Sequence, residues 1–275
     1  MSLNPQLKRY TDGRIKTVGI GFWQSWTPEL AYILGFAYAD GGIGEGRNSL
    51  SLYQDTPELF EKIQRVVGQG KLTFSKAGVW VLRFCEPALS SILVDYGIIP
   101  NKTTFGYWPK TMPNEFRANY IRGFFDGDGT IAQRSRGSGS VGFVCHSRSY
   151  LERLEAELCD LSLTHRNLVA DRGNFRLRYS SHSDVKQLYE LFYSSQPSLF
   201  MDRKRTKFDE VIRSIENSTP ARGERQHSAR LTEQQVLDIR AESAKGIPRN
   251  VLAKRYGIGK TTASKIINRI TWRHI

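Results

Sequence analysis

The sequence predicts a mixed α+β protein made of two similar halves, with a small all-α domain after them. A motif of apolar, small and acidic residues occurs twice, at an offset of 88 residues. Each copy is followed by alternating strand and helix patterns, whereas the last part of the chain shows only helical spacing. With 275 residues, 39% of them hydrophobic, the chain can bury a core in each part.

The repeat begins with two predicted helices. The stretches "ELAYILGFAYADGGI" (29–43) and "ANYIRGFFDGDGTI" (118–131) share one register. In the first copy, Thr27 followed by Pro28 is a helix start signal, and the glycines after the acids are stop signals in both copies. The matched positions are Gly35 with Gly123, Ala39 with Gly127, Asp40 with Asp128, and Gly41 with Gly129.

The similarity continues beyond these helices. Residues 50–67 and 141–158 each read as an alternating strand followed by an amphipathic helix. Residues 79–84 and 175–180 read as further strands, and a helical pattern follows in both copies. Each half is therefore predicted to run helix, two strands, helix, two strands, helix. The predicted boundaries are 1–112 for the first half and 113–217 for the second.

Small residues on the motif helices predict where the halves meet. In each copy two of them lie four apart on one helical face, as Gly35 and Ala39 do, which lets two helix backbones approach closely. Packing about a pseudo-twofold axis would bring Asp40 and Asp128 together. Adjacent carboxylates repel unless they share a proton or a cation, and oxygen ligands suit Mg²⁺. We therefore predict a shared metal site, and the alternative is that each Asp only caps a turn.

Charge indicates the class of partner. The chain has 40 Lys and Arg against 27 Asp and Glu, a net charge of +13 and a pI near 9.7, which favours a polyanion such as nucleic acid. Residues 216–275 hold 12 basic and 5 acidic side chains, so the tail is the most basic part.

The sequence also suggests a compartment. No apolar run approaches the ~20 residues of a membrane helix, and the first residues lack the apolar stretch of a secretory signal. We expect an intracellular protein, in the cytoplasm or nucleoid of a bacterial or phage-infected cell, or in an organelle. Cys85, Cys145 and Cys159 lack the paired spacing of a disulfide framework or a zinc site, so we expect reduced packing residues.

The tail predicts a linker and a second domain. Residues 218–230 are polar and bracketed by Ser, Pro and Gly, which is typical of a linker. In residues 231–275, Thr232 and Gln235 form a capping box for a first helix, which runs to about Lys245. Pro248 opens a second helix and a turn at Gly257 leads to a third. We expect the apolar face of this third helix to consist of Ala263, Ile266, Ile267 and Ile270.

This helix-turn-helix pattern resembles the small domains of resolvases and phage endonucleases. The opposite face of its third helix offers side chains suited to phosphate and base contacts. They are Lys260, Thr261, Thr262, Ser264, Lys265 and Asn268. The alternative is a three-helix packing domain without DNA contact.

Both motif helices resemble the LAGLIDADG motif of homing endonucleases, as "ILGFAYADG" and "IRGFFDGDG". The resemblance covers roughly residues 25–213. It implies a monomer, with no obligatory protein partner, whose two αββαββα halves form a saddle over double-stranded DNA. It also implies that Asp40 and Asp128 are the catalytic metal-binding acids. Two positions depart from the pattern: Tyr38 replaces a frequent acid, and Arg122 is unusual for a buried seam, so we expect Arg122 to point outward.

The resemblance further implies Mg²⁺ as the cofactor. Roughly two or three divalent ions would be shared between the two acids, with Mn²⁺ able to substitute. We include Ala39 and Gly127, the residues before the acids, in the predicted metal site.

Four other residues are candidates for catalysis. The family uses a basic residue near its active site, and Lys102 and Lys204 lie in matching segments of the two halves. Such a lysine could stabilise the pentacovalent phosphate or polarise the attacking water. Gln54 and His146, at the ends of matched strands, are candidates for positioning water or the scissile phosphate, although such positions are more often simply surface.

Basic side chains on or beside the predicted strands suit contacts with guanine edges and phosphates. The alternative is a solvated charged face. In the first half they are Arg47, Lys71, Lys76 and Arg83, and in the second Arg134, Arg136, Arg166, Arg172, Arg176 and Arg178.

The resemblance, together with the duplicated acids and the basic charge, implies a site-specific homing endonuclease that makes a staggered double-strand break in a long target by metal-dependent phosphodiester hydrolysis. One rival is a transcriptional regulator that combines a LAGLIDADG scaffold with a helix-turn-helix and does not cleave. Such regulators have typically lost the acids that this chain keeps. A second rival is an intron RNA maturase.

Overall fold

The computed structural model describes residues 7–9, 15–17, 20–43, 48–86, 89–99, 107–134, 137–218, 229–273 and 275. Its contacts divide the chain into two units, Met1–Ser218 and Thr219–Ile275, which are described separately. Near the N-terminus, β1 (Leu7–Arg9) pairs antiparallel with β2 (Ile15–Thr17). Among the described residues, no helix is long and apolar enough to cross a membrane.

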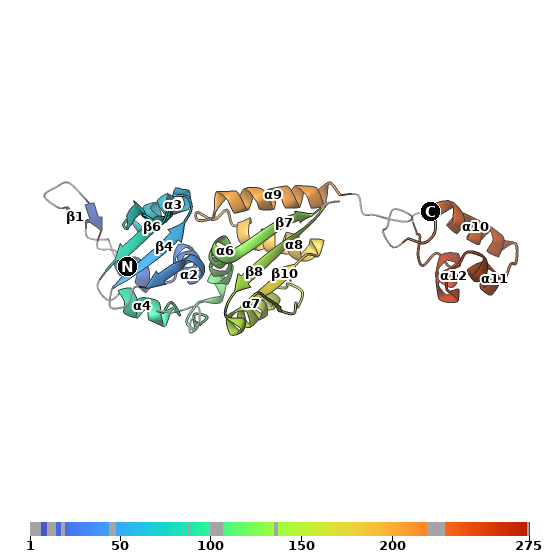
Figure 1. Cartoon of the computed structure of the whole chain (residues 1–275), viewed down its shortest axis with the longest axis horizontal. Helices are drawn as coiled ribbons and strands as arrows, with labels where there is room; N and C mark the ends of the chain where they lie inside the picture. Colours follow the sequence, from blue (N-terminus) through green and yellow to red (C-terminus); the bar gives the residue numbers. More distant parts are fainter. Residues whose placement is uncertain are drawn as a thin grey trace. The chain divides into compact units, whose positions relative to one another are not determined.

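The first unit contains two halves with the same order of elements (Figure 1). After α1 (Ile20–Gln24), the first half consists of α2 (Pro28–Asp40), β3 (Gly41–Ile43), β4 (Ser49–Gln54), α3 (Glu58–Val67), β5 (Lys71–Phe74), β6 (Trp80–Cys85) and α4 (Leu89–Asp95). After the short η1 (Asn114–Phe116), the second consists of α6 (Arg117–Asp128), β7 (Gly129–Arg134), β8 (Ser138–Cys145), α7 (Arg148–Asp160), β9 (Val169–Asp171), β10 (Asn174–Tyr179), α8 (His182–Tyr193) and α9 (Asp202–Glu216).

Each half builds one four-stranded antiparallel sheet. The strand orders are β3-β4-β6-β5 and β7-β8-β10-β9, so the two sheets have the same topology. Gly41 lies opposite Leu52 in the first sheet, and Gly129 lies opposite Phe143 in the second. The predicted α+β class with paired αββαββα halves is confirmed.

Local sequence explains where the motif helices begin and end. The Thr27 side chain accepts a hydrogen bond from the Leu30 N–H at 3.0 Å, and Pro28 occupies the first turn of α2, where its missing N–H costs nothing. Gly41 and Gly129 then take extended backbone conformations, so each helix passes directly into a strand. Each motif acid is therefore the last residue of its helix.

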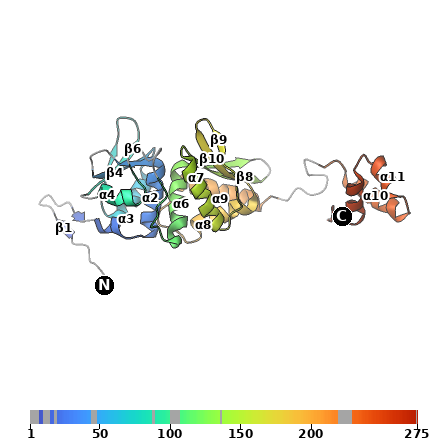
Figure 2. The same cartoon turned by 90° about the horizontal axis from the view of Figure 1, so that it is seen from below.

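Glycines let α2 and α6 pack backbone to backbone, side by side between the two sheets (Figures 1 and 2). A Cβ atom placed on Gly35 would overlap the Tyr120 carbonyl oxygen, and one on Gly123 would overlap the Tyr32 carbonyl oxygen. The contacts are reciprocal because Tyr32 and Tyr120 occupy matching positions of the repeat. The close approach predicted from the small residues is thus present.

One long apolar core runs through both halves. Leu52 and Phe143 are fully buried, whereas the β10 residue Arg178 is exposed between the buried Leu177 and Tyr179. This alternation shows that the helices cover one face of the sheet and leave the other open.

Arg122 corrects one expectation. It is 2% exposed and does not point outward. Its guanidinium donates to the carbonyl oxygens of Phe192 (3.0 Å) and Leu199 (3.1 Å), at and beyond the end of α8, and to the Asn119 side chain. A planar group with five donors can satisfy backbone carbonyls that a helix end leaves unpaired, so Arg122 is tolerated in the core.

The cysteine expectation is also only partly right. All three are free thiols, and Cys145 is buried, but Cys159 is partly exposed and Cys85 is exposed at the end of β6. Cys85 is therefore not a packing residue.

The second unit contains α10 (Glu233–Ala244), α11 (Arg249–Arg255) and α12 (Lys260–Ile267) around its own small core. The predicted capping box of Thr232 and Gln235 is present, and Trp272 packs against the core. The third helix is shorter than predicted. It ends at Ile267 and the chain turns at Arg269, which has a positive φ, so Ile270 is 52% exposed instead of lying on the apolar face.

The helix crossing makes a testable prediction. Gly35→Ala should lower the free energy of unfolding by about 1–3 kcal/mol or more, because backbone atoms of α6 cannot move aside for the new methyl group. Urea-induced unfolding measures this. Gly21→Ala in α1 is the matched control, since nothing lies within 4 Å of its added Cβ, and it should not destabilise. Equal stability of the Gly35 variant and the natural chain would contradict the close approach.

Candidate active site at the paired helix ends

Asp40 and Asp128 end α2 and α6, and both are partly exposed. A Cβ atom on Gly127 would lie 3.4 Å from the Asp40 Oδ2 atom, so the first acid reaches the backbone immediately before the second. Ala39 meets Gly127 in the same crossing. The small residues thus leave room at the helix ends for two carboxylates from different halves.

A polar chain connects the first acid to the second half. The Gln54 side chain, at the end of β4, donates to Asp40 Oδ2 at 2.9 Å. Arg203, in the first turn of α9, donates to the side-chain amide oxygen (Oε1) of Gln54 at 3.4 Å. Gln54 is 8% exposed and its orientation is therefore fixed, whereas Arg203 is exposed. The sequence predicted Gln54 as a site residue but not Arg203, which directly precedes the predicted Lys204.

Lys204 holds the end of the helix that carries Asp128. Its ammonium group donates to the carbonyl oxygens of Phe125 (2.6 Å), Gly127 (3.0 Å) and Gly129 (2.8 Å). These carbonyls belong to the last turn of α6 and its cap, where backbone carbonyls lose their intrahelical partners; the Phe125 carbonyl also accepts from the Gly129 N–H. Burial lowers the pKa of Lys204 to about 8, although the nearby acids raise it. All three N–H bonds are used, so the side chain positions a helix end.

Asp126 is a fully buried carboxylate two residues before Asp128. Its Oδ2 atom accepts from the Tyr32 hydroxyl (2.7 Å) and from the Met201 N–H (2.8 Å). Burial raises the pKa of Asp126 to about 6, and these two bonds and the charge of Lys204 oppose the rise. Asp126 therefore ties together α6, α2 and the start of α9.

Tyr38 takes the place of this acid in the first half. Its ring stacks on Tyr150 of α7, with centroids 3.7 Å apart, and also contacts Phe124. The departure from the family pattern thus replaces a buried polar contact between the halves with an aromatic one.

The two half-sites differ in a further way. In the first sheet Gly41 pairs with Leu52, and Gln54 follows two residues later. In the second sheet Gly129 pairs with Phe143, so the position that corresponds to Gln54 is Cys145. His146, the predicted counterpart of Gln54, is exposed and comes one residue later, after β8 has ended. Lys102, the counterpart of Lys204, lies outside the described residues.

The donors at the helix ends suit a hard divalent cation. Asp40 and Asp128 are the last residues of α2 and α6, and Asp40 Oδ2 lies beside the Gly127 backbone, so the oxygen ligands that such an ion prefers come from both halves. A helix C-terminus disfavours negative charge; the Lys204 ammonium offsets part of this at the end of α6, and a divalent cation between the acids would offset more. The residues present therefore fit Mg²⁺ or Mn²⁺. Asp40 and Asp128 would hold it, whereas the predicted contribution of the Gly127 backbone does not fit, because its carbonyl already accepts from the Lys204 ammonium.

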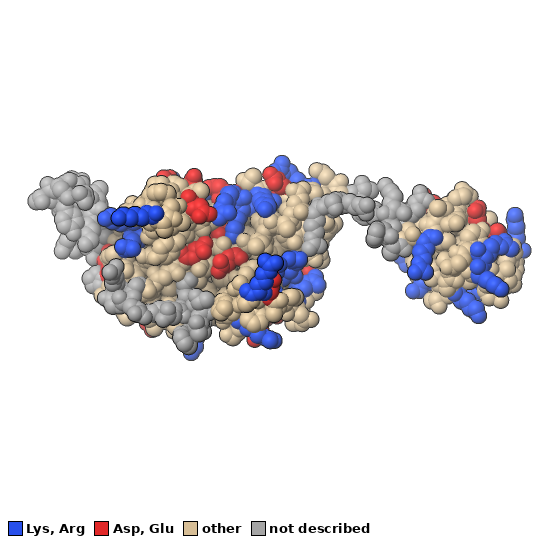
Figure 3. Space-filling model, in the orientation of Figure 1, with Lys and Arg blue, Asp and Glu red and all other residues tan. Residues whose placement is uncertain are grey.

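Two arginines match across the open sheet faces. Arg83 lies opposite Ser51 and donates to its hydroxyl at 3.1 Å. Arg178 lies opposite Gly142, in the same register of the second sheet, and both arginines are exposed. Lys71 extends the first row as the neighbour of Arg83. In Figure 3 acidic side chains gather between the two halves, with basic side chains to either side.

The other side chains predicted to contact DNA differ in their exposure and in whether an acid already pairs with them. Lys76 and Arg172 are exposed at the tips of the β5–β6 and β9–β10 hairpins. Arg176 is paired with Asp171 at 2.5 Å, and Arg166 with Asp184 at 2.7 Å, so acids partly neutralise both. Arg134 lies at the end of β7, and Arg47 and Arg136 lie outside the described residues. On α12 the predicted polar face is exposed apart from Ser264, which is half-buried.

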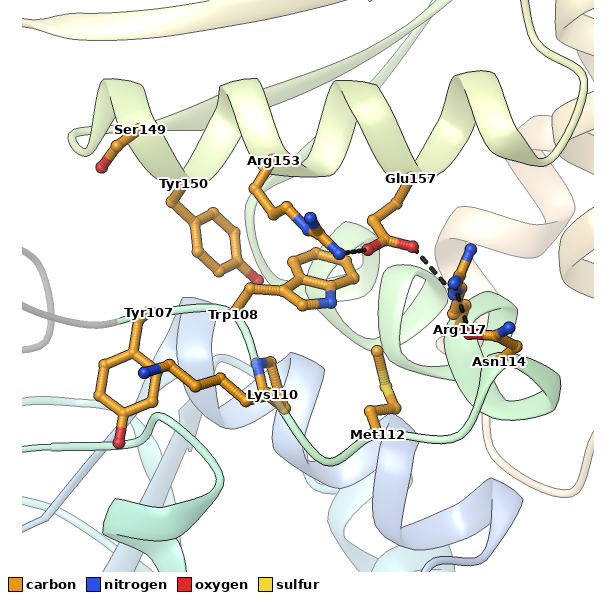
Figure 4. Close-up of a pocket in the computed structure, with 11 residues that line it drawn as sticks. Tyr107, Trp108, Lys110, Met112, Asn114, Arg117, Ser149, Tyr150, Arg153 and Glu157 are labelled. Carbon is orange, nitrogen blue, oxygen red and sulfur yellow. Dashed lines mark hydrogen bonds and ion pairs between the residues drawn. The ribbon is translucent and has the colours of Figure 1, made fainter.

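A pocket of about 610 Å³ lies beside α7 and not at the acids. Figure 4 shows Trp108, Tyr150 and Met112 along it, and Arg153 and Arg117 pointing at the buried carboxylate of Glu157. Glu157 joins α7 to the start of α6, which makes this cluster a structural link.

Comparisons with known proteins give one family match and several structural likenesses. Residues 115–192 match the family described as a LAGLIDADG-like domain. No curated protein matches the sequence. Three solved structures illustrate the likeness. The LAGLIDADG meganuclease I-AabMI bound to uncleaved DNA is 13% identical, with a TM-score of 0.49 over 70% of this chain and 91% of that one.

Two others differ in kind. A variant of I-DmoI, in complex with its target DNA and in the presence of manganese, is 14% identical, with a TM-score of 0.47 over 62% of this chain and 96% of that one. Full-length DUF199/WhiA from Thermatoga maritima is 13% identical, with a TM-score of 0.48 over 92% and 94%. Likeness at this level does not transfer an activity.

The class of the second half follows from the family match. It is a LAGLIDADG-like domain, whose motif helix α6 ends in Asp128. The first half has the same strand order and its own copy of the motif, which ends in Asp40.

The buried acid gives a prediction on stability. Asp126→Ala should cost about 3–5 kcal/mol, because it leaves the Tyr32 hydroxyl and the Met201 N–H without an acceptor beside two buried cations. Urea-induced unfolding would check this, with the exposed Asp55→Ala as control, expected within about 0.5 kcal/mol of the natural chain. Asp126→Asn keeps an acceptor and should recover much of the loss. An Asp126→Ala variant as stable as the control would contradict the assignment.

Proposed function

We propose that the chain is a site-specific homing endonuclease that makes a staggered double-strand break in a long DNA target. The contact between Asp40 and the backbone that precedes Asp128 carries this proposal. It places the end of α2 against the end of α6, so that the two acids would supply oxygen ligands from both halves, and each half has an open sheet face that carries Arg83 or Arg178. A binding scaffold alone gives no reason for two carboxylates at adjoining helix ends, where the helix dipoles oppose them.

The proposed chemistry is phosphodiester hydrolysis. Divalent ions held by Asp40 and Asp128 would activate a water molecule and stabilise the leaving 3′ oxygen. Gln54 fixes the Asp40 carboxylate, and Lys204 fixes the end of α6 behind Asp128. Arg203 is exposed beside Gln54, where it can contact the phosphate backbone.

The two half-sites are chemically different, because Gln54 has no amide counterpart in the second sheet. We therefore propose that the two DNA strands are cut at different rates. His146 remains a candidate for positioning water in the second half-site.

We propose that the three-helix tail is a helix-turn-helix domain that adds affinity for DNA. Its exposed side chains on α12 include Lys260 and Lys265, and the capping box fixes the first helix. This tail is also the observation that favours the runner-up, a regulator that binds DNA without cleaving. A cleavage assay separates the two.

The acids give the decisive prediction. With Mg²⁺ present, the protein should cut linear DNA that carries its target, and Asp40→Asn or Asp128→Asn should reduce double-strand cleavage by at least about 100-fold. Binding measured by gel shift should survive in both variants. Gel analysis of cleavage rates measures the loss, with Asp160→Asn on the exposed end of α7 as control. Unchanged cutting by either acid variant would reject the proposal, and binding without cutting by the natural chain would favour the regulator.

The tail gives an independent prediction. Deleting residues 219–275 should weaken DNA binding and reduce the slope of log K against log salt, because cationic contacts with phosphates are removed. The cutting rate at saturating protein should not change. Filter binding at several salt concentrations measures this. Equal affinity and equal slope for the truncated chain would show that the tail makes no DNA contact.

A further inference from the structure

A second group of metal-ligating side chains lies on α7 and the segment after it, apart from the acids of the motif helices. It consists of Glu155, Cys159 and His165, whose ligand atoms all lie within 4.8 Å of one another. Among the described residues, no other set of three His, Cys, Asp or Glu side chains comes together in this way. We propose that these three side chains form a binding site for one Zn²⁺ ion, a site independent of the proposed nuclease function.

Backbone geometry brings the group together. Glu155 and Cys159 are four residues apart and so share one face of α7. The chain then reverses at Ser162, which has a φ of 72°, and the Leu163 N–H donates to the Leu158 carbonyl oxygen at 3.0 Å. A non-glycine residue in this left-handed region is uncommon, and here the turn carries His165 back beside Glu155.

The contacts converge on one carboxylate oxygen. Glu155 Oε1 lies 2.8 Å from the His165 Nδ1 atom and accepts a hydrogen bond from the Cys159 Sγ at 3.0 Å. It also accepts from the Arg166 N–H at 3.0 Å, which fixes the carboxylate in place. One thiol, one imidazole and one carboxylate are the donor types of three-ligand zinc sites, in which water completes the tetrahedron.

A buried hydroxyl adds a second, independent observation. Tyr179, on the β10 strand beneath α7, is fully buried, and its hydroxyl has no hydrogen-bond partner. Burial raises the pKa of Tyr179, and the Glu155 carboxylate lies close enough to raise it further. An unpaired buried hydroxyl is costly, and a ligand water on the metal would give it a partner.

The local charges permit a cation. Arg166 is the nearest basic side chain along the chain, and its guanidinium is paired with Asp184 at 2.7 Å. Without metal, burial and Glu155 raise the pKa of Cys159 to about 11, so the thiol stays protonated. Zinc binding would form a Zn–S bond and release that proton to solvent, so affinity falls as pH falls.

Such an ion would fasten the segment 161–168 to α7. This segment leads directly into β9, whose hairpin with β10 carries Arg172 at its tip. The bound ion would therefore stabilise the segment that precedes β9, the edge strand of the second sheet.

Cobalt substitution tests the proposal, because thiolate bound to Co²⁺ gives a charge-transfer band in the near ultraviolet. The protein used is the full-length chain with Asp40→Asn and Asp128→Asn, which removes the other proposed metal site. One equivalent of Co²⁺ should produce the band and Zn²⁺ should displace it. Cys159→Ser should abolish the band, and Cys85→Ser, which removes an exposed thiol elsewhere, should keep it.

The remaining outcomes also decide the question. His165→Asn should weaken Zn²⁺ binding in calorimetry by at least about 10-fold, and this histidine is mostly exposed, so its loss should not unfold the chain. Zinc should raise the melting temperature of the starting protein, the chain with Asp40→Asn and Asp128→Asn, and should not raise that of the same protein with Cys159→Ser added. The proposed site would be overturned if the starting protein gave no Co²⁺–thiolate band, or if the band persisted after Cys159→Ser.

Discussion

The first unit depends on the close packing of α2 against α6. Gly35 and Gly123 each face a carbonyl oxygen of the other helix, so no side chain separates the two backbones. This crossing joins the two sheets into one body and fixes the distance between the helix ends. Because packed helices do not deform continuously, the position of Asp40 relative to Gly127 follows from contacts made more than a helical turn away.

The crossing is supported by polar contacts that are not symmetric. Asp126 joins α6 to Tyr32 and to the start of α9, whereas the matching Tyr38 stacks on Tyr150. Lys204 of α9 caps the end of α6. Asp202, also in α9, pairs with Lys62 of α3 at 2.7 Å. The start of α9 therefore belongs to both halves. A duplicated scaffold has kept its backbone symmetry while its buried side chains have diverged.

Asymmetry also describes the candidate site. Gln54 is hydrogen-bonded to both Asp40 and Arg203. The corresponding position of the second sheet holds Cys145, which has no side-chain amide. The open faces retain one matched pair, Arg83 and Arg178, while Arg176 is held by Asp171 within the second sheet. A target read by these faces would accordingly need no strict palindrome, since the two halves present different chemistry to it.

The sequence by itself determined the repeat, the order of helices and strands in each half, the helix start at Thr27 and the meeting of small residues on the motif helices. These features are local or periodic, so spacing along the chain reveals them. Only the tertiary structure decided the burial of Arg122, the use of all three Lys204 protons, the contact of Arg203 with Gln54 and the gathering of Glu155, Cys159 and His165. Each depends on partners from separate elements, whose distance apart no spacing along the chain encodes.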